Sequence, residues 1–150
     1  VGAVVCYEPV RTRLMRRGGR VLFDSRRIPR EIADVVMARA SVVRDRPEAL
    51  QALLRGMSRA LAHYREHPED ARAIMARRES LSAEAFKLAI DGAHLVGPDE
   101  NRRLLRGEGP ELAEALKVQR RVMRRTGLLE GSPDPERLIT GRFVCEECLR

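Results

Sequence analysis

Two patterns of apolar residues divide the chain. Short β-branched runs occupy residues 1–7, 20–24 and 32–39, and each run is bounded by glycine, proline or charged residues. A short continuous apolar run of this kind is typical of a strand that is buried on both faces. The first 40 residues therefore predict three strands.

A helix is predicted between the first two strands. Pro9 suits the first helical position, where its missing N–H costs nothing, and the carboxylate of Glu8 complements the positive end of the helix. The pair Gly18 and Gly19 then ends the helix. The segment between residues 8 and 19 thus carries its own start and stop signals.

From Pro47 onward the apolar residues recur at intervals of three and four, which is the period of an amphipathic helix. The longest predicted helix runs from Pro47 to about His67. Pro68 begins another helix, and Ser82 is a suitable N-cap for a third. Further predicted elements are a helical turn over residues 101–105, a helix over 110–126 that ends at Gly127, a last turn at 135–139 and an extended piece at 143–144.

This order of elements favours an α/β fold in which a few short strands precede a helical tail. Three short strands do not make a self-sufficient sheet, and their apolar character implies further strands beside them. The chain also begins with Val1 inside a predicted strand, without a basic leader. We therefore expect a piece of a longer protein, and its sequence carries no signal segment from which to read its location.

Composition narrows the class of protein. The chain has 150 residues, 43% hydrophobic and 34% charged, which is globular and allows one domain or two small ones. No run of 18 apolar residues is present, so no membrane span is predicted. Aromatic residues make up 3%, which argues against a platform that stacks nucleic-acid bases.

The net charge of +7 comes almost entirely from arginine, since Lys87 and Lys117 are the only lysines. A positive balance permits binding to anionic partners. Arginine-rich, lysine-poor usage also reflects a GC-rich genome, and the arginines are scattered along the chain. Charge alone therefore does not establish nucleic-acid binding.

The ordered set of short motifs resembles the second half of the substrate-binding proteins of nitrate, sulfonate and taurine-type ABC importers, which include thiamine-precursor binders. The resemblance covers roughly residues 1–130. It is carried by Ala-Val-Val-Cys-Tyr-Glu-Pro at 3–9, Gly-Gly-Arg-Val-Leu-Phe-Asp-Ser at 18–25, Ile-Pro at 28–29, the run at 32–39, and the helical blocks at 46–50, 59–61 and 67–71.

The resemblance implies part of a type II periplasmic binding-protein fold, in which two α/β lobes close on a ligand. Residues 1–22 would be the tail of lobe two, 23–144 the C-terminal part of lobe one, and 145–150 a tail, with the hinge near 20–30. The implied function is that of the solute-binding component of an importer, periplasmic or anchored outside the cytoplasmic membrane. Its implied partners are the importer's permease and a small sulfonate, amine or pyrimidine-type ligand held in an interlobe cleft.

The same resemblance implies four ligand-binding residues. Tyr7 and Glu8 match the Tyr-Glu-Pro segment, Ser25 matches the first serine of an Asp-Ser-Ser segment, and Asp34 matches an acidic position that faces the ligand amine in taurine-type relatives. The chain departs from the pattern at Arg26 and Arg30. Both departures put extra positive charge near the crossing loop.

Each of these side chains also has a structural interpretation. Glu8 can serve the helix dipole instead of a ligand, and Ser25 can cap its loop. Asp34 in an apolar strand needs a partner, because burying a bare carboxylate costs several kcal/mol. That partner is either a ligand cation or one of the neighbouring arginines, Arg30 or Arg39.

No residues predict catalysis, a cofactor or a metal site. Motifs of hydrolases, zinc proteases and phosphate-binding loops are absent. Cys145 and Cys148 lack the second pair that a structural zinc needs, so the preferred interpretation is a frayed tail, with or without a disulfide between them. His63 and His67 share a helix face at i, i+4, which permits chelation, although surface histidines are the simpler interpretation.

Two other hypotheses stay open. A small basic helical protein that binds nucleic acid would need the arginines of residues 120–125 on one exposed face. A truncated fragment without its own activity would expose incomplete sheet edges and would form a homodimer to cover them.

Overall fold

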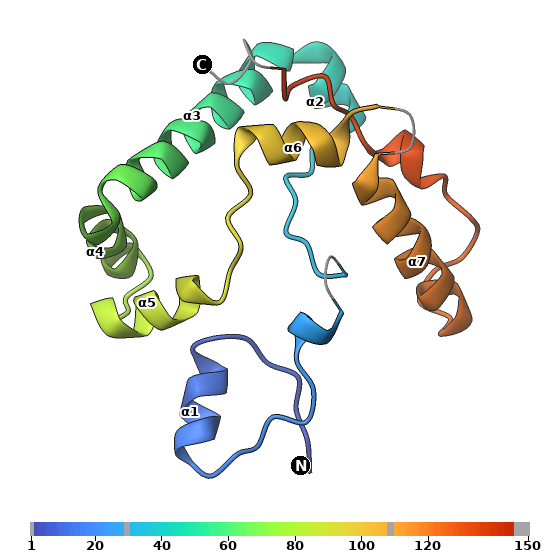
Figure 1. Ribbon diagram of the computed structural model, residues 1–150. Coiled ribbons are helices and arrows are strands. Elements are labelled where there is room, and N and C mark those ends of the chain that lie inside the picture. Colours follow the sequence, from blue (N-terminus) through green and yellow to red (C-terminus); the bar gives the residue numbers. More distant parts are fainter. Residues whose placement is uncertain (1, 29–30, 108–109, 146–150) are drawn as a thin grey trace. The chain divides into compact units, whose positions relative to one another are not determined.

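The computed structural model describes residues 2–28, 31–107 and 110–145 (Figure 1). Of these residues, 59% are helical and none lies in a strand. The predicted α/β class, and with it the type II periplasmic binding-protein fold, is therefore wrong for this chain as the structure shows it.

The three predicted strands are irregular backbone in the structure. Residues 2–7 and 32–39 have no regular secondary structure, and residues 20–24 contain only a bend. The predicted extended piece at 143–144 begins in a turn. The physical reason is that a strand completes its backbone hydrogen bonds only on a neighbouring strand, and the described part of the chain offers none.

The predicted helices are present, with bounds close to those expected. The structure adds α2 and the short η1, which the sequence did not predict. The elements are α1 (Val10–Arg16), η1 (Ser25–Arg27), α2 (Ala40–Asp45), α3 (Pro47–Glu66), α4 (Pro68–Arg78), α5 (Ala83–Asp91), α6 (Pro98–Leu105), α7 (Glu111–Arg125) and η2 (Pro135–Leu138).

Helix ends follow the local signals in the sequence. Gly18 has φ +87° just after α1, a conformation that favours glycine, and the N–H of Gly19 donates to Leu14 O at 2.9 Å. Ser82 caps α5 by accepting a hydrogen bond from the N–H of Ala85 at 3.1 Å. Gly127 has φ +72° after α7, as its predicted place beyond the helix end requires.

The chain divides into two compact units. Unit 1 comprises Val1–Asp24 and Ala60–Leu95, and unit 2 comprises Ser25–Arg59 and Val96–Arg150. The long helix α3 belongs to both units. The boundaries predicted at residues 22 and 144 refer to lobes of a larger protein and stay predictions.

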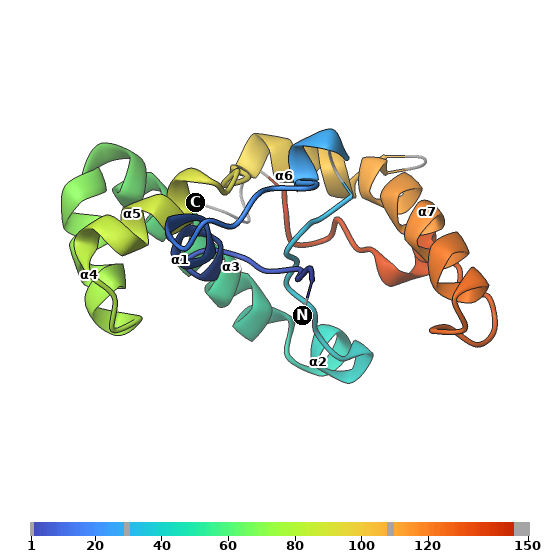
Figure 2. The same ribbon diagram turned by 90° about the horizontal axis from the view of Figure 1, so that it is seen from below.

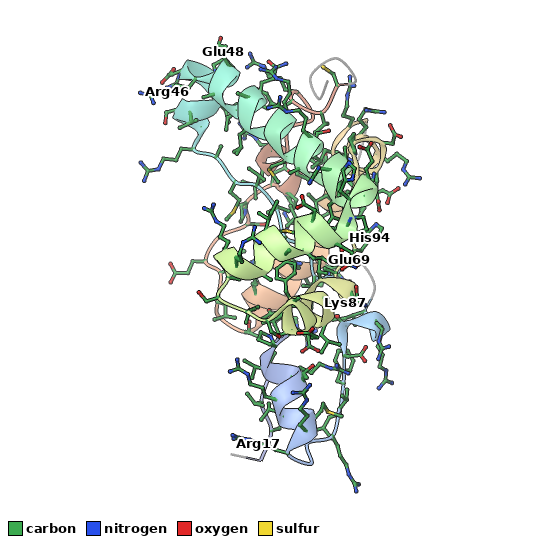
Figure 3. The ribbon with its side chains drawn as sticks, turned by 90° about the vertical axis from the view of Figure 1, so that its left-hand side faces the viewer. Arg17, Arg46, Glu48, Glu69, Lys87 and His94 are labelled. Atoms are coloured by element: carbon green, nitrogen blue, oxygen red, sulfur yellow. The ribbon has the colours of Figure 1, made fainter. Side chains whose placement is uncertain are left out.

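Unit 1 is centred on α4 and α5, which lie side by side in both ribbon views (Figure 1, Figure 2). Ala71 and Ala76 of α4 and Phe86 of α5 are the buried residues of these two helices. Arg72 lies 5.7 Å from the ring centroid of Tyr64 and 2.8 Å from Glu69 Oε1. Figure 3 shows Glu69 on α4 and Lys87 on α5, and Asp91 of α5 pairs both with Lys87 and, at 3.8 Å, with Arg72 of α4.

Unit 2 joins α6, α7 and η2. Ala113 of α7 is fully buried, and Phe143 and Val144 are also buried. The ammonium of Lys117 lies 2.8 Å from Glu114 Oε1 and 3.2 Å from Glu136 Oε1, so it ties α7 to η2. These acidic partners raise the pKa of Lys117, the hydrogen bond to Glu114 being the larger cause.

The buried core is small for the size of the chain. Among the described residues, the buried hydrophobic side chains are Ala71, Ala76, Phe86, Ala113, Phe143 and Val144. Valines, leucines, isoleucines and methionines are exposed along residues 4–37.

Candidate functional site

A hollow of about 130 Å³ in unit 1 holds one of the four predicted ligand-binding residues, Glu8. It lies between the start of α1 and the start of α5. Its polar lining consists of two carboxylates, two guanidinium groups and two hydroxyls, and its apolar lining is Pro9, Ala85 and Leu88. The polar residues are Glu8, Thr12, Arg13, Arg16, Ser82 and Glu84.

Glu8 is fixed by the first turn of α1. Its Oε2 accepts a hydrogen bond from Thr12 Oγ1 at 2.7 Å and another from the Thr12 N–H at 3.1 Å, while Oε1 lies 3.0 Å from Arg11 Nη1. The side chain is only 16% exposed. The hydroxyl of Thr12, more than Arg11, lowers the pKa of the Glu8 carboxyl, so the group is an anion at neutral pH.

Three charged groups of the lining are uncommitted. Arg13, Arg16 and Glu84 are exposed, and none of them forms an ion pair with any residue that the structure describes. A guanidinium donates two parallel hydrogen bonds to a planar or tetrahedral anion, and a carboxylate accepts from an ammonium. The hollow therefore offers both signs of charge over a short span.

Each of the two hydroxyls in the lining already forms one hydrogen bond at a helix N-terminus. Ser82 Oγ accepts the Ala85 N–H as the N-cap of α5, which leaves its proton able to donate. Thr12 Oγ1 donates to Glu8. Ser82 therefore adds a neutral donor beside the charged groups.

The other predicted site residues lie elsewhere. Tyr7 precedes α1 and is 74% exposed, outside the lining of the hollow. Ser25 is exposed at the start of η1, where its carbonyl accepts the Ile28 N–H at 3.0 Å. Asp34 is exposed in residues 32–39, so the expectation of a carboxylate inside an apolar strand is wrong.

The structure thus brings Tyr7 and Glu8 into unit 1 and puts Ser25 and Asp34 in unit 2. Arg39 forms no ion pair with Asp34, and Arg30 lies outside the described residues. The four positions remain predictions as a ligand-binding set, and only Glu8 lines a hollow.

Five polar residues of the hollow were not predicted as ligand-binding: Thr12, Arg13, Arg16, Ser82 and Glu84. Ser82 had a recognisable role as an N-cap, but nothing in the sequence connects it with a helix about 70 residues earlier. The exposed arginines after Pro9 carry no spacing that distinguishes them from surface charge. Where α1 lies relative to α5 decides this site.

A second hollow, of about 540 Å³, lies in unit 2 between the end of α6 and the segment around Thr140. Among the described residues that line it, Glu136 is the one carboxylate and is already paired with Lys117, and none of the predicted site residues is in that lining. The larger volume is therefore the weaker candidate for specific recognition.

No group of three or more histidine, cysteine or acidic residues in the described part of the chain is arranged to hold a metal ion. His63 Nε2 lies 2.9 Å from Asp70 Oδ2, and the rings of His63 and His67 are 5.0 Å apart. Cys145 is disulfide-bonded, and the Cys6 thiol is free. Cys148 lies outside the described residues.

The described helices include none with the length and apolar character needed to cross a membrane. No family model matches the chain, and neither a curated protein nor a solved structure is significantly similar to it. The likeness to importer binding proteins therefore remains a prediction from the motifs.

Proposed function

We propose that the chain is part of the solute-binding component of an ABC importer and that it helps to hold a small ligand carrying both an amine and an anionic group. The observation that carries the proposal is the hollow at Glu8, which presents carboxylates and guanidinium groups of one unit around about 130 Å³. The motif resemblance supplies the class of protein, and the lining supplies the class of ligand.

The size of the hollow favours a compact ligand. A volume of 130 Å³ corresponds to about four water molecules at their liquid density. A molecule with an ammonium at one end and a sulfonate at the other matches this size. An extended polymer or a nucleotide does not.

The proposed role is recognition without chemistry. The anionic Glu8 and Glu84 accept hydrogen bonds from the ammonium of the ligand, while Arg13 and Arg16 donate to its sulfonate oxygens. Because Glu8 is already held by Thr12 and Arg11, it is ordered before the ligand arrives. The bound state would then be recognised by the importer's permease.

The test is calorimetric titration of the purified chain with a small aminosulfonate, an alkylsulfonate without the amine and an alkylamine without the sulfonate. We expect binding of the aminosulfonate, weakened about tenfold by loss of either charged group, as expected for charge-assisted hydrogen bonds. E84Q and R13Q should weaken binding similarly. R17Q, an exposed arginine outside the lining, is the matched control and should not.

Absence of heat and of thermal shift with all three ligands would contradict the proposal. So would binding that E84Q and R13Q leave unchanged, because the ligand would then occupy another place.

One observation favours nucleic-acid binding as a second candidate. Arg121, Arg124 and Arg125 are exposed on the last turns of α7, and none of them forms an ion pair with another described residue. At 100° per residue they lie within about 100° of each other around the helix. Arg120 is not part of this group, because it is half-buried and donates to Pro133 O at 2.9 Å.

A short DNA duplex distinguishes the two candidates. Nucleic-acid binding would weaken steeply as salt rises, and R121Q and R125Q would reduce the salt slope by about 1 for each lost phosphate contact. A duplex that fails to bind at 50 mM salt would remove this candidate and leave the small-ligand proposal untouched.

A further inference from the structure

Residues 32–39 form an exposed apolar segment that lies outside every helix of the described part of the chain. Six of the eight residues are apolar, and all eight are exposed. Met37 is 87% exposed, and Ile32, Val35 and Val36 are each at least half exposed. A monomer rarely leaves so continuous an apolar stretch in water, so the segment is a candidate interaction surface.

The backbone of this segment also has N–H and C=O groups without hydrogen-bond partners among the described residues. No backbone hydrogen bond joins residues 32–38 to another described residue. The segment is anchored only at its ends: Gln119 of α7 donates to Glu31 O at 2.6 Å, and α2 begins at Ala40. A run of free N–H and C=O groups is a template on which another extended chain pairs.

The charges at the ends of the segment select its partner. Two identical segments paired antiparallel about a two-fold axis place one residue opposite its own copy. With Val35 on the axis, Ala33 faces Met37, and Glu31 of each chain faces Arg39 of the other. Glu31 and Arg39 form no ion pair within the described part of their own chain, so both are available.

Neighbouring registers lack this match. An axis at Asp34 would bring two like charges together, which is destabilising. An axis at Val36 would put Arg39 opposite Ala33 and leave Glu31 without a cation. The register centred on Val35 therefore combines apolar contacts with two opposite-charge pairs.

We propose that two copies of the chain associate through residues 31–39, paired antiparallel about a two-fold axis at Val35. The pairing is between chains and leaves each chain helical. It brings apolar side chains of the two segments into cross-strand contact, pairs their backbones and closes after two copies. It involves none of the residues that line the hollow at Glu8, so it stands or falls independently of the proposed ligand binding.

Sedimentation equilibrium of the full chain across a range of concentrations tests the proposal. We expect a monomer–dimer equilibrium. V35K puts two ammonium groups at the axis and should weaken the dimer at least tenfold. The matched control is M57K, which places the same charge at an exposed methionine of α3 outside the segment and should leave the dimer constant unchanged. Circular dichroism should show the same helicity in both variants.

Charge reversal gives a sharper test of the register. E31R alone brings two guanidinium groups face to face at each end of the paired segments, and R39E alone brings two carboxylates face to face. Each variant should therefore dimerise about tenfold more weakly than the original chain. An equimolar mixture of E31R and R39E should recover dimerisation, because each chain then meets the opposite charges on the other.

Four outcomes would overturn the proposal. A chain that stays monomeric at all concentrations has no such interface. A dimer that V35K leaves intact uses another surface, and so does an open-ended aggregate. A mixture of E31R and R39E that dimerises no better than either variant alone excludes the register centred on Val35.

Discussion

The helix pair α4 and α5 and the segment at 32–39 both carry apolar side chains, but they differ in burial and in backbone hydrogen bonding. In the pair, Phe86 and Ala76 are buried and the backbone hydrogen bonds are internal to each helix. In the segment, every side chain is exposed, and residues 32–38 form no backbone hydrogen bond with another described residue. The difference teaches that a helix needs only a neighbour for its apolar face, whereas a β-patterned segment also needs a neighbour for its backbone.

The largest expected effect tests the helix pair. F86A removes the largest buried side chain of unit 1 and should lower the free energy of unfolding by about 3 kcal/mol. L88A, on the same helix but 46% exposed, should cost less than about 1 kcal/mol. Urea unfolding followed by helicity measures both. Equal effects of the two variants would show that α5 does not pack on α4 through Phe86.

The next effect concerns the joint between α6 and the segment at Gly141. A Cβ added at Gly141 would lie 2.8 Å from Leu105 O and against Arg106 Cγ, so G141A should destabilise the chain by about 1–3 kcal/mol. The control is G56A in α3, where a Cβ meets open space. It should stabilise the helix by up to about 1 kcal/mol. Thermal unfolding of the two variants should shift in opposite directions.

A smaller effect depends on pH. The folded-state pKa of Glu8 lies below its ordinary value, chiefly because Thr12 donates to the carboxylate. The ionised group therefore stabilises the fold at any pH above the ordinary value, and this contribution is lost as pH falls through the lowered folded-state pKa. E8Q should cost about 1 kcal/mol at pH 7, as loss of a helix cap does.

The stability difference between E8Q and the original chain should itself depend on pH. At a pH low enough to protonate Glu8 in the folded chain, the stability difference between E8Q and the original should vanish. A difference that persists unchanged in acid would mean that the charge of Glu8 is not what supports α1.

The smallest effect tests the exposed segment. M37Q replaces the most exposed apolar side chain of residues 32–39, and it should change the stability of the monomer by no more than about 0.5 kcal/mol. Unfolding at a concentration below the dimer range measures this. A loss as large as that of F86A would show that the segment packs on its own chain.

The sequence predicts an element well when the interactions that form it are local in the chain, and poorly when they involve distant residues. The helices were predicted because their signals are local, as with the Ser82 cap and the glycines after α1 and α7. The strands were wrongly predicted because strand formation depends on a distant partner. Helix α2 was missed because Val42 and Val43 favour strands, and its end at Arg46 has no glycine.

The candidate site was partly predictable for the same reason. The placing of Glu8 at the start of α1 is a local matter of Pro9 and the first helical turn, and the structure confirms it. Its meeting with Ser82 and Glu84 depends on how α1 approaches α5, which no motif encodes. Asp34 was assigned to a buried strand that the structure does not contain among its described residues.

The exposed arginines at the end of α7 carry one more consequence. Guanidinium groups keep their positive charge at every pH a cell reaches, and three histidines are too few to reverse a net charge of +7. Acidification therefore offers no means of switching this face off. The electrostatic attraction of this face can instead be weakened by raising the ionic strength or by an anionic partner that covers the arginines.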